Sequence, residues 1–116
     1  MADKSRFASE TLVGAKAVTT GITGVTARKS GNIVTLLIAP SAITISSASW
    51  HQLGTLPQEL RPSMNLRFTG FDNSAETYAA SPVLPFTIST SGAVSVYFFR
   101  DKLTMAPHAS VTYITN

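Results

Sequence analysis

The sequence has 116 residues, of which 44% are hydrophobic and 13% are charged, with a formal net charge of +3. This length suits one domain and excludes a multidomain enzyme, and the composition is too apolar and too weakly charged for a disordered chain. The absence of cysteine excludes a disulfide framework, a thiolate nucleophile and a cysteine-based metal site. The basic residues form no stripe of the kind that nucleic-acid binding needs, and the longest apolar run is far shorter than the ~20 residues of a membrane helix. We therefore expect a soluble domain with no nucleic-acid partner and no membrane insertion.

Threonine and serine make up a quarter of the chain, a usage that favours strands and turns over helices. No segment of ten or more residues shows the apolar spacing of a helix. The sequence therefore predicts an all-β fold of seven to eight strands, arranged as a sandwich, a jelly roll or a small barrel. Residues 1–16 have no sustained periodicity and are expected to be an N-terminal tail or linker, and residues 17–116 are expected to form the β domain.

The first half of this domain begins with a predicted hairpin. Residues 18–28 alternate small and β-branched side chains, residues 28–32 supply turn chemistry, and residues 33–39 form an apolar strand. Residues 43–45, which follow a proline, predict a short edge strand.

Residues 50–63 form the least generic stretch of the sequence. Pro57 and Pro62 forbid a regular helix or central strand, so this stretch is predicted to be an ordered crossover loop. Trp50 is expected to be a buried anchor that packs against the loop, and the alternative is a platform for a ligand. Arg61 is expected to bond loop carbonyls or a nearby carboxylate.

The second half contains three further predicted strands. Residues 64–71 alternate, with Met64, Leu66 and Phe68 on one face and Arg67 on the other. A polar loop at 72–78 precedes a strand pair, and a second polar loop at 100–110 precedes a last strand. The strands of the pair span 83–90 and 93–99 around a turn at Ser91 and Gly92, and the last strand spans 111–114. The predicted core consists of inward apolar residues: Leu36, Ile38, Leu66, Phe68, Phe86, Ile88, Val94, Val96 and Phe98.

The chain offers no recognisable catalytic site. Asp72 and Glu76 are the only closely spaced acidic residues, and their polar loop gives neither carboxyl the burial that a catalytic dyad requires. His51 and His108 are too far apart to form a metal-binding motif. We expect no catalytic residue, no metal and no cofactor.

Two aromatic residues close together in the sequence are expected on the outer face of a strand. Tyr97 and Phe99 share the strand face opposite Val96 and Phe98, and would reach solvent unless something covers them. The cover could be a loop, a neighbouring subunit or a ligand.

Three stretches, at residues 50–63, 86–97 and 110–114, together resemble the C-terminal head domain of bacteriophage tail-tip receptor-binding proteins, notably those of phages infecting lactococci, and related tail-fibre or baseplate proteins. The resemblance spans roughly residues 17–116, and its most specific element is the tryptophan followed by a loop ending in Arg61-Pro62. It implies a small Greek-key barrel or jelly-roll head domain. It also implies a homotrimeric virion protein at the tail tip or baseplate, contacting other tail or baseplate proteins. It also implies that the head binds host cell-wall saccharides in the extracellular medium without cleaving them.

The family pattern is only partly matched at the positions that hold the saccharide. Tyr97 stands where such heads carry an aromatic residue after the glycine turn. Pro85 and Thr87 stand where a histidine and an acidic residue can occur, and His108 replaces an arginine. These departures leave open whether the saccharide site is retained, altered, moved or absent.

The expected ligand site lies where the loop 72–78 approaches the later loops of the same or a neighbouring chain. It would supply ring faces, carboxylates and cations for a saccharide. Its residues are Asp72, Tyr78, Tyr97, Arg100, Asp101 and His108. The alternative function is a structural or trimerisation module of a tail fibre or baseplate that binds no glycan, and hydrolysis of host polysaccharide is disfavoured by the shortage of carboxylates.

Overall fold

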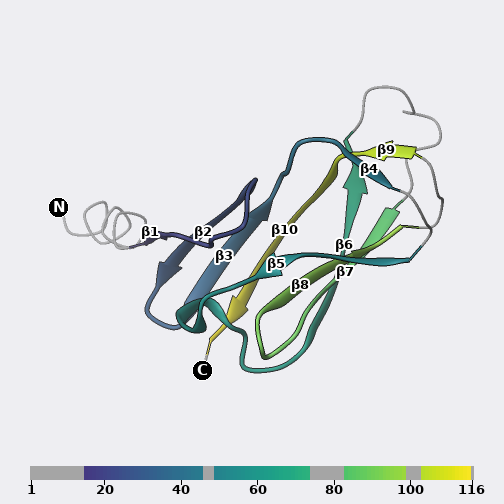
Figure 1. Cartoon of the computed structure of the whole chain (residues 1–116). Coiled ribbons are helices and arrows are strands. Elements are labelled where there is room, and N and C mark those ends of the chain that lie inside the picture. The colour runs from purple at the N-terminus through teal and green to yellow at the C-terminus, as the bar shows by residue number, and fades with distance from the viewer. Residues whose placement is uncertain (1–14, 46–48, 74–82, 99–102, 116) are drawn as a thin grey trace, which may run out of the picture.

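The computed structural model describes residues 15–45, 49–73, 83–98 and 103–115 (Figure 1). This part of the chain contains strands and one short 3-10 helix, which confirms the predicted all-β class. The elements are β1 (Lys16–Val18), β2 (Val25–Ser30), β3 (Ile33–Ile38), β4 (Ile43–Ile45), β5 (Trp50–Thr55), η1 (Gln58–Leu60), β6 (Leu66–Asp72), β7 (Val83–Ile88), β8 (Ala93–Tyr97), β9 (Leu103–Met105) and β10 (Pro107–Ile114). None of the described segments is a helix long and apolar enough to cross a membrane.

Eight strands form one antiparallel sheet in the order β1-β2-β3-β10-β6-β7-β8-β5, and β4 pairs with β9 in a separate two-stranded sheet. In Figure 1 the long strand β10, in yellow, runs between β3 and β6 and so joins the two halves of the large sheet. The two ends of the sheet approach each other. A Cβ on Gly54 of β5 would lie 2.6 Å from Ile22, which precedes β2, and Lys29 of β2 donates a hydrogen bond to the Glu59 carbonyl at 2.7 Å. The sheet is therefore curled on itself, as a small barrel or sandwich requires.

The core fills the inside of this curled sheet. On β3 and β7 every second side chain is buried, which is the period expected of strands with one face inward. Seven of the predicted core residues are fully buried, namely Leu36, Ile38, Phe86, Ile88, Val94, Val96 and Phe98. The other two, Leu66 and Phe68, are partly buried and pack against the core. Met64 does not share their face, because it precedes β6 and is 65% exposed.

Four strand assignments from the sequence are wrong. The first hairpin strand, predicted over residues 18–28, is β2 and spans only Val25–Ser30, because Gly21 and Gly24 adopt positive φ in a turn before it. Residues 50–55 form β5 rather than part of a loop, because both prolines come after the strand and leave its ladder with β8 intact. The predicted polar loop 100–110 contains β9 and the start of β10, which begins at Pro107, a position where a proline is tolerated. β1 starts at Lys16, inside the predicted tail, because it pairs with β2. The domain boundary otherwise stays a prediction, since residues 1–14 lie outside the described part.

The loop after β5 is fixed through its carbonyl groups. Arg61 Nε donates to the Leu56 carbonyl at 3.2 Å, which confirms the predicted bond from this guanidinium to a loop carbonyl. The Tyr113 hydroxyl of β10 donates to the Leu60 carbonyl at 2.6 Å. Leu56 and Leu60 are both fully buried. The loop is thus anchored by leucines pointing inward and by hydrogen bonds, so it holds β5 in place beside β8.

Candidate functional site

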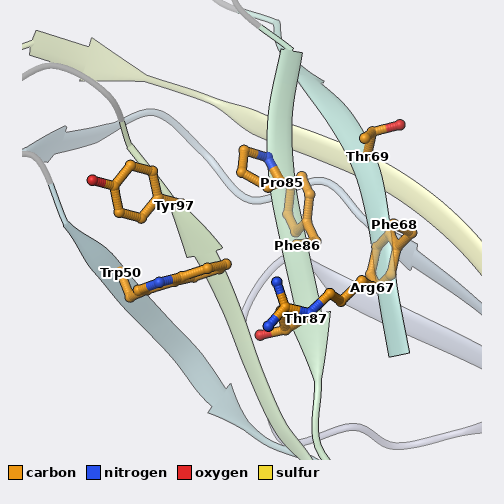
Figure 2. Close-up of a pocket in the computed structure, with 8 residues that line it drawn as sticks. All are labelled: Trp50, Arg67, Phe68, Thr69, Pro85, Phe86, Thr87 and Tyr97. Atoms are coloured by element: carbon orange, nitrogen blue, oxygen red, sulfur yellow. The ribbon is translucent and has the colours of Figure 1, made fainter. Parts of the chain in front are cut away.

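A groove of about 440 Å³ lies on the outer side of the large sheet. Its volume is within the range of small-molecule sites. The residues that line it come from β5, β6, β7 and β8, and are Trp50, Arg67, Phe68, Thr69, Pro85, Phe86, Thr87 and Tyr97 (Figure 2). Four consecutive strands therefore contribute to one concave surface.

The groove opens where β7 and β8 stop pairing. Their ladder runs from Ile88↔Val94 to Phe86↔Val96 and ends there. Pro85 follows on β7 and has no backbone N–H to donate to a neighbouring strand, so the ladder ends readily at this point. Tyr97 instead pairs with Trp50 on its other side. Beyond Phe86 the two strands thus have different partners, and the space between Pro85 and Tyr97 becomes part of the groove.

An aromatic pair forms one wall. The Trp50 and Tyr97 rings meet edge to face, with centroids 5.2 Å apart and planes at 70°. Figure 2 shows both rings on the same side of the opening, with Pro85 and Thr87 across from them. Trp50 is 47% exposed, so much of its indole surface is available to a ligand.

The expectation that Trp50 is a buried anchor of the proline loop is wrong. Trp50 begins an edge strand and points to the outer side, where it contacts Tyr97, while Arg61 and Tyr113 bond to the loop. The next residue, His51, is the one that points inward, where its ring lies edge to face with Phe98 at 4.9 Å. Alternation along β5 decides this, since neighbouring residues on a strand face opposite ways.

Arg67 provides the positive charge of the groove. It is directly opposite Thr87 in the β6–β7 ladder and is exposed, because the alternation that turns Phe86 and Ile88 inward turns Thr87 and Arg67 outward. Figure 2 shows its side chain extending from β6 across Thr87 toward Trp50. A guanidinium offers five N–H donors in a fixed plane. The groove thus combines two ring faces, a planar cation and threonine hydroxyls.

Asp72 does not belong to this groove. It is 5% exposed, and its Oδ1 accepts the Ala106 N–H at 3.0 Å. Asp72 also pairs with Pro107 where β10 joins β6. The expectation of an exposed loop carboxylate at Asp72 is therefore wrong, because the side chain is used to fix the start of β10.

The described part of the chain contains one other expected ligand-binding residue, His108, and it does not line the groove with Tyr97. His108 lies on β10, opposite Phe71, and their ring centroids are 5.9 Å apart. It is absent from the described lining of the groove. Tyr78, Arg100 and Asp101 lie outside the described residues, as does Phe99. Within the described part of the chain, no three histidine or acidic side chains gather in a way that could hold a metal ion.

Sequence reasoning identified Tyr97 but missed Arg67, Pro85 and Thr87 as neighbours in one groove. Alternation places Arg67 correctly on the polar face of its strand, and the signal that could have marked Pro85 is the occurrence of a proline inside the strand predicted at 83–90. Their convergence depends on the pairing of β6 with β7 and of β5 with β8, which joins segments distant in sequence. Alternation alone gives the face of a residue and not its cross-strand neighbour.

Comparisons with known proteins identify the fold. No protein-family model matches the chain, and no curated protein matches it. Among solved structures, the chain is similar to the head domain of phage bIL170, whose crystal structure was described in the context of a common fold for the receptor binding domains of lactococcal phages. The TM-score is 0.63 at 12% identity, and the match covers 88% of this chain and 99% of that domain. The chain thus has the fold of a lactococcal phage head domain, which confirms the fold that the sequence resemblance implied.

Proposed function

We propose that this domain is the receptor-binding head of a phage tail protein and that it adheres to a saccharide of the host cell surface, with the Trp50–Tyr97 groove as its binding site. The observation that carries the proposal is this groove, found on the fold of a phage head domain. The bIL170 domain is grouped with receptor binding domains, and the match covers nearly all of it.

The groove has the chemistry that a saccharide requires. Sugar rings present C–H groups that pack on aromatic faces, and hydroxyl groups that need fixed donors and acceptors. Trp50 and Tyr97 supply the aromatic surface. Arg67 and Thr87, directly opposite each other, supply donors within the same groove. We therefore assign sugar stacking to Trp50 and Tyr97 and hydroxyl recognition to Arg67 and Thr87.

The rest of the proposal concerns assembly and place. We propose that the domain acts as a homotrimer at the phage tail tip or baseplate, held by other tail proteins and exposed to the medium, and that it binds without cleaving. Trimerisation is supported by exposed apolar side chains on the outer side of β3 and β10, where Ile33 is opposite Ile114 and Leu37 lies on the same face. Exposed apolar residues gathered in this way are typical of protein interfaces.

The proposal is tested by calorimetric titration of the protein with purified cell-envelope polysaccharides from a panel of lactococcal strains. We expect the parent to bind at least one of them. Trp50→Ala and Arg67→Gln should each weaken binding about tenfold or more, because a stacking surface and a charged donor are worth roughly 1.5–3 kcal/mol each. Arg28→Gln is the matched control, since it removes the same charge from an exposed position on β2.

Two results would contradict the proposal. Equal binding by the parent, Trp50→Ala and Arg67→Gln would move the site away from the groove. Binding to none of the polysaccharides would favour the alternative, a structural or trimerisation module of a tail fibre or baseplate. Release of sugar fragments during the titration would contradict adhesion without cleavage.

A further inference from the structure

A second hollow adjoins the groove along β6 and β7. It has a volume of about 500 Å³, and its lining consists of Asn65, Leu66, Arg67, Thr87, Ile88 and Ser89. Arg67 and Thr87 line both hollows. The two hollows are therefore parts of one furrow, and we use this name for the combined surface from Trp50 to Asn65.

The length of the furrow follows from the register of the two strands. Thr69 is opposite Pro85 and Arg67 is opposite Thr87, and these outward pairs are two residues apart. Asn65 precedes Arg67 by two residues, immediately before the start of β6. Outward positions on a strand repeat about every 6.6 Å, so Thr69 and Asn65 are about 13 Å apart. This distance exceeds the width of a single sugar ring.

Polar groups are available along the whole furrow. Among the described residues, the Arg67 guanidinium and the Thr87 hydroxyl have no hydrogen-bond partner. Asn65 accepts the Thr90 N–H through Oδ1 at 3.0 Å, which fixes the amide and leaves its NH₂ group as a donor. The furrow thus has an aromatic end and a row of hydrogen-bond donors that continues past it.

We infer that the furrow binds a chain of several linked sugars rather than one terminal sugar. One sugar stacks on Trp50 and Tyr97, and the following units lie along β6 and β7 past Arg67 to Asn65. The inference rests on the proposed function and identifies its ligand as an internal or extended stretch of polysaccharide. The occupant follows from continuity, because the second hollow shares two of its walls with the proposed sugar site.

The far end of the bound chain is set by Asn65. A third hollow of about 490 Å³ lies beyond it, and its described lining residues are Gln58, Glu59, Arg61 and Thr90. None of these lines the furrow. The proposed site therefore ends at Asn65 and Ser89.

The experiment uses the envelope polysaccharide bound in the titrations above, partly hydrolysed and separated by size into fragments from one sugar upward. The parent should bind longer fragments more tightly until the fragment spans the furrow, and no more tightly after that. Asn65→Ala should weaken binding of the long fragments about fivefold, the loss expected for one hydrogen bond. The same variant should bind the single sugar as the parent does.

Two further variants make this test specific. Asn65→Asp keeps an oxygen for the Thr90 N–H but removes the NH₂ donor, so it separates ligand contact from support of the turn. It should also weaken binding of the long fragments. Asn32→Ala is the matched control, because Asn32 is an exposed asparagine in the β2–β3 turn, outside the furrow. It should bind every fragment as the parent does.

The possible failures are distinguishable. Affinity that does not rise beyond one sugar, or long-fragment binding unchanged in both Asn65 variants, would overturn the inference while leaving the Trp50–Tyr97 site in place. Equal binding of all fragments by the parent and Trp50→Ala would overturn the proposed site, and the inference with it.

Discussion

The hydroxyl of Tyr113 shows how one side chain joins distant parts of the chain. It is 5% exposed and donates to the Leu60 carbonyl across the core. Burial raises its pKa from 10.0 to about 12. The folded state therefore keeps the proton at a pH where the unfolded chain has lost it, so the stabilisation is complete below about pH 10 and is lost as the pH rises through about 12.

We expect Tyr113→Phe to lower the free energy of unfolding by about 1–2 kcal/mol at pH 8, because the buried Leu60 carbonyl loses its donor. Denaturant unfolding of both proteins at several pH values between 8 and about 11.5 measures this. The difference between them should shrink as the pH rises above about 10, because only the parent has the phenol to ionise. A difference that stayed constant with pH would contradict a raised pKa at Tyr113.

Trp50 is a binding residue in our proposal, so we expect its removal to lower the stability of the fold only slightly. The side chain is half exposed on an edge strand, and its ring contact is with Tyr97. We expect Trp50→Ala to cost about 1 kcal/mol, near the value of an aromatic pair. Phe98→Ala is the comparison, and should cost about 3–5 kcal/mol because Phe98 is fully buried. Equal losses in thermal unfolding would return Trp50 to the role of a structural anchor.

At the scale of the strands, the pairing of β6 with β10 is sensitive to a single added methyl group at Gly70. A Cβ on Gly70 would lie 2.5 Å from Phe86 Cε1 and 2.7 Å from Ala109 Cβ, and would also meet the His108 carbonyl. We expect Gly70→Ala to destabilise the protein by roughly 1–3 kcal/mol through overpacking. Thr69→Ala, at the exposed neighbouring position, should change stability by less than about 0.5 kcal/mol. Similar melting of both variants would show that the strands separate easily at this point.

Strands whose pattern depends on neighbouring residues could be predicted from the sequence, and strands that depend on a distant partner could not. Period-two alternation placed β3 and the buried faces of β7 and β8 correctly, because it depends on neighbouring residues only. β5 and β9 were missed because each is short or mixed in composition and becomes a strand through a distant partner, β8 or β4. The groove was missed for the same reason. Alternation predicts which face of the sheet each groove residue lies on. The pairing register of the strands, which alternation does not predict, brings Arg67 and Thr87 near Trp50.

At the scale of the whole molecule, the proposed trimer can be tested through the apolar face of β3 and β10. Light scattering after size exclusion at micromolar concentration should report three chains. Leu37→Glu should yield monomers, because a charge would be buried without a partner at the interface. Val83→Glu is the control, since Val83 is also an exposed apolar residue but lies on β7, outside this face. A parent protein that elutes as a monomer would contradict the trimer.

A monomeric Leu37→Glu variant would also separate affinity from avidity. The furrow lies on β5 to β8, away from Leu37 on β3, so each chain should keep its own site. A weak site in the ~µM to mM range gives useful adhesion only when several sites engage one surface. We therefore expect the variant to bind short fragments as the parent does, but to bind intact polysaccharide on cells about 100-fold more weakly, because the second and third sites no longer act at high effective concentration. Surface plasmon resonance on immobilised polysaccharide measures the affinity for the intact polymer, and calorimetry measures the affinity for the fragments. Equal loss in both assays would mean that the site itself needs residues from a neighbouring chain.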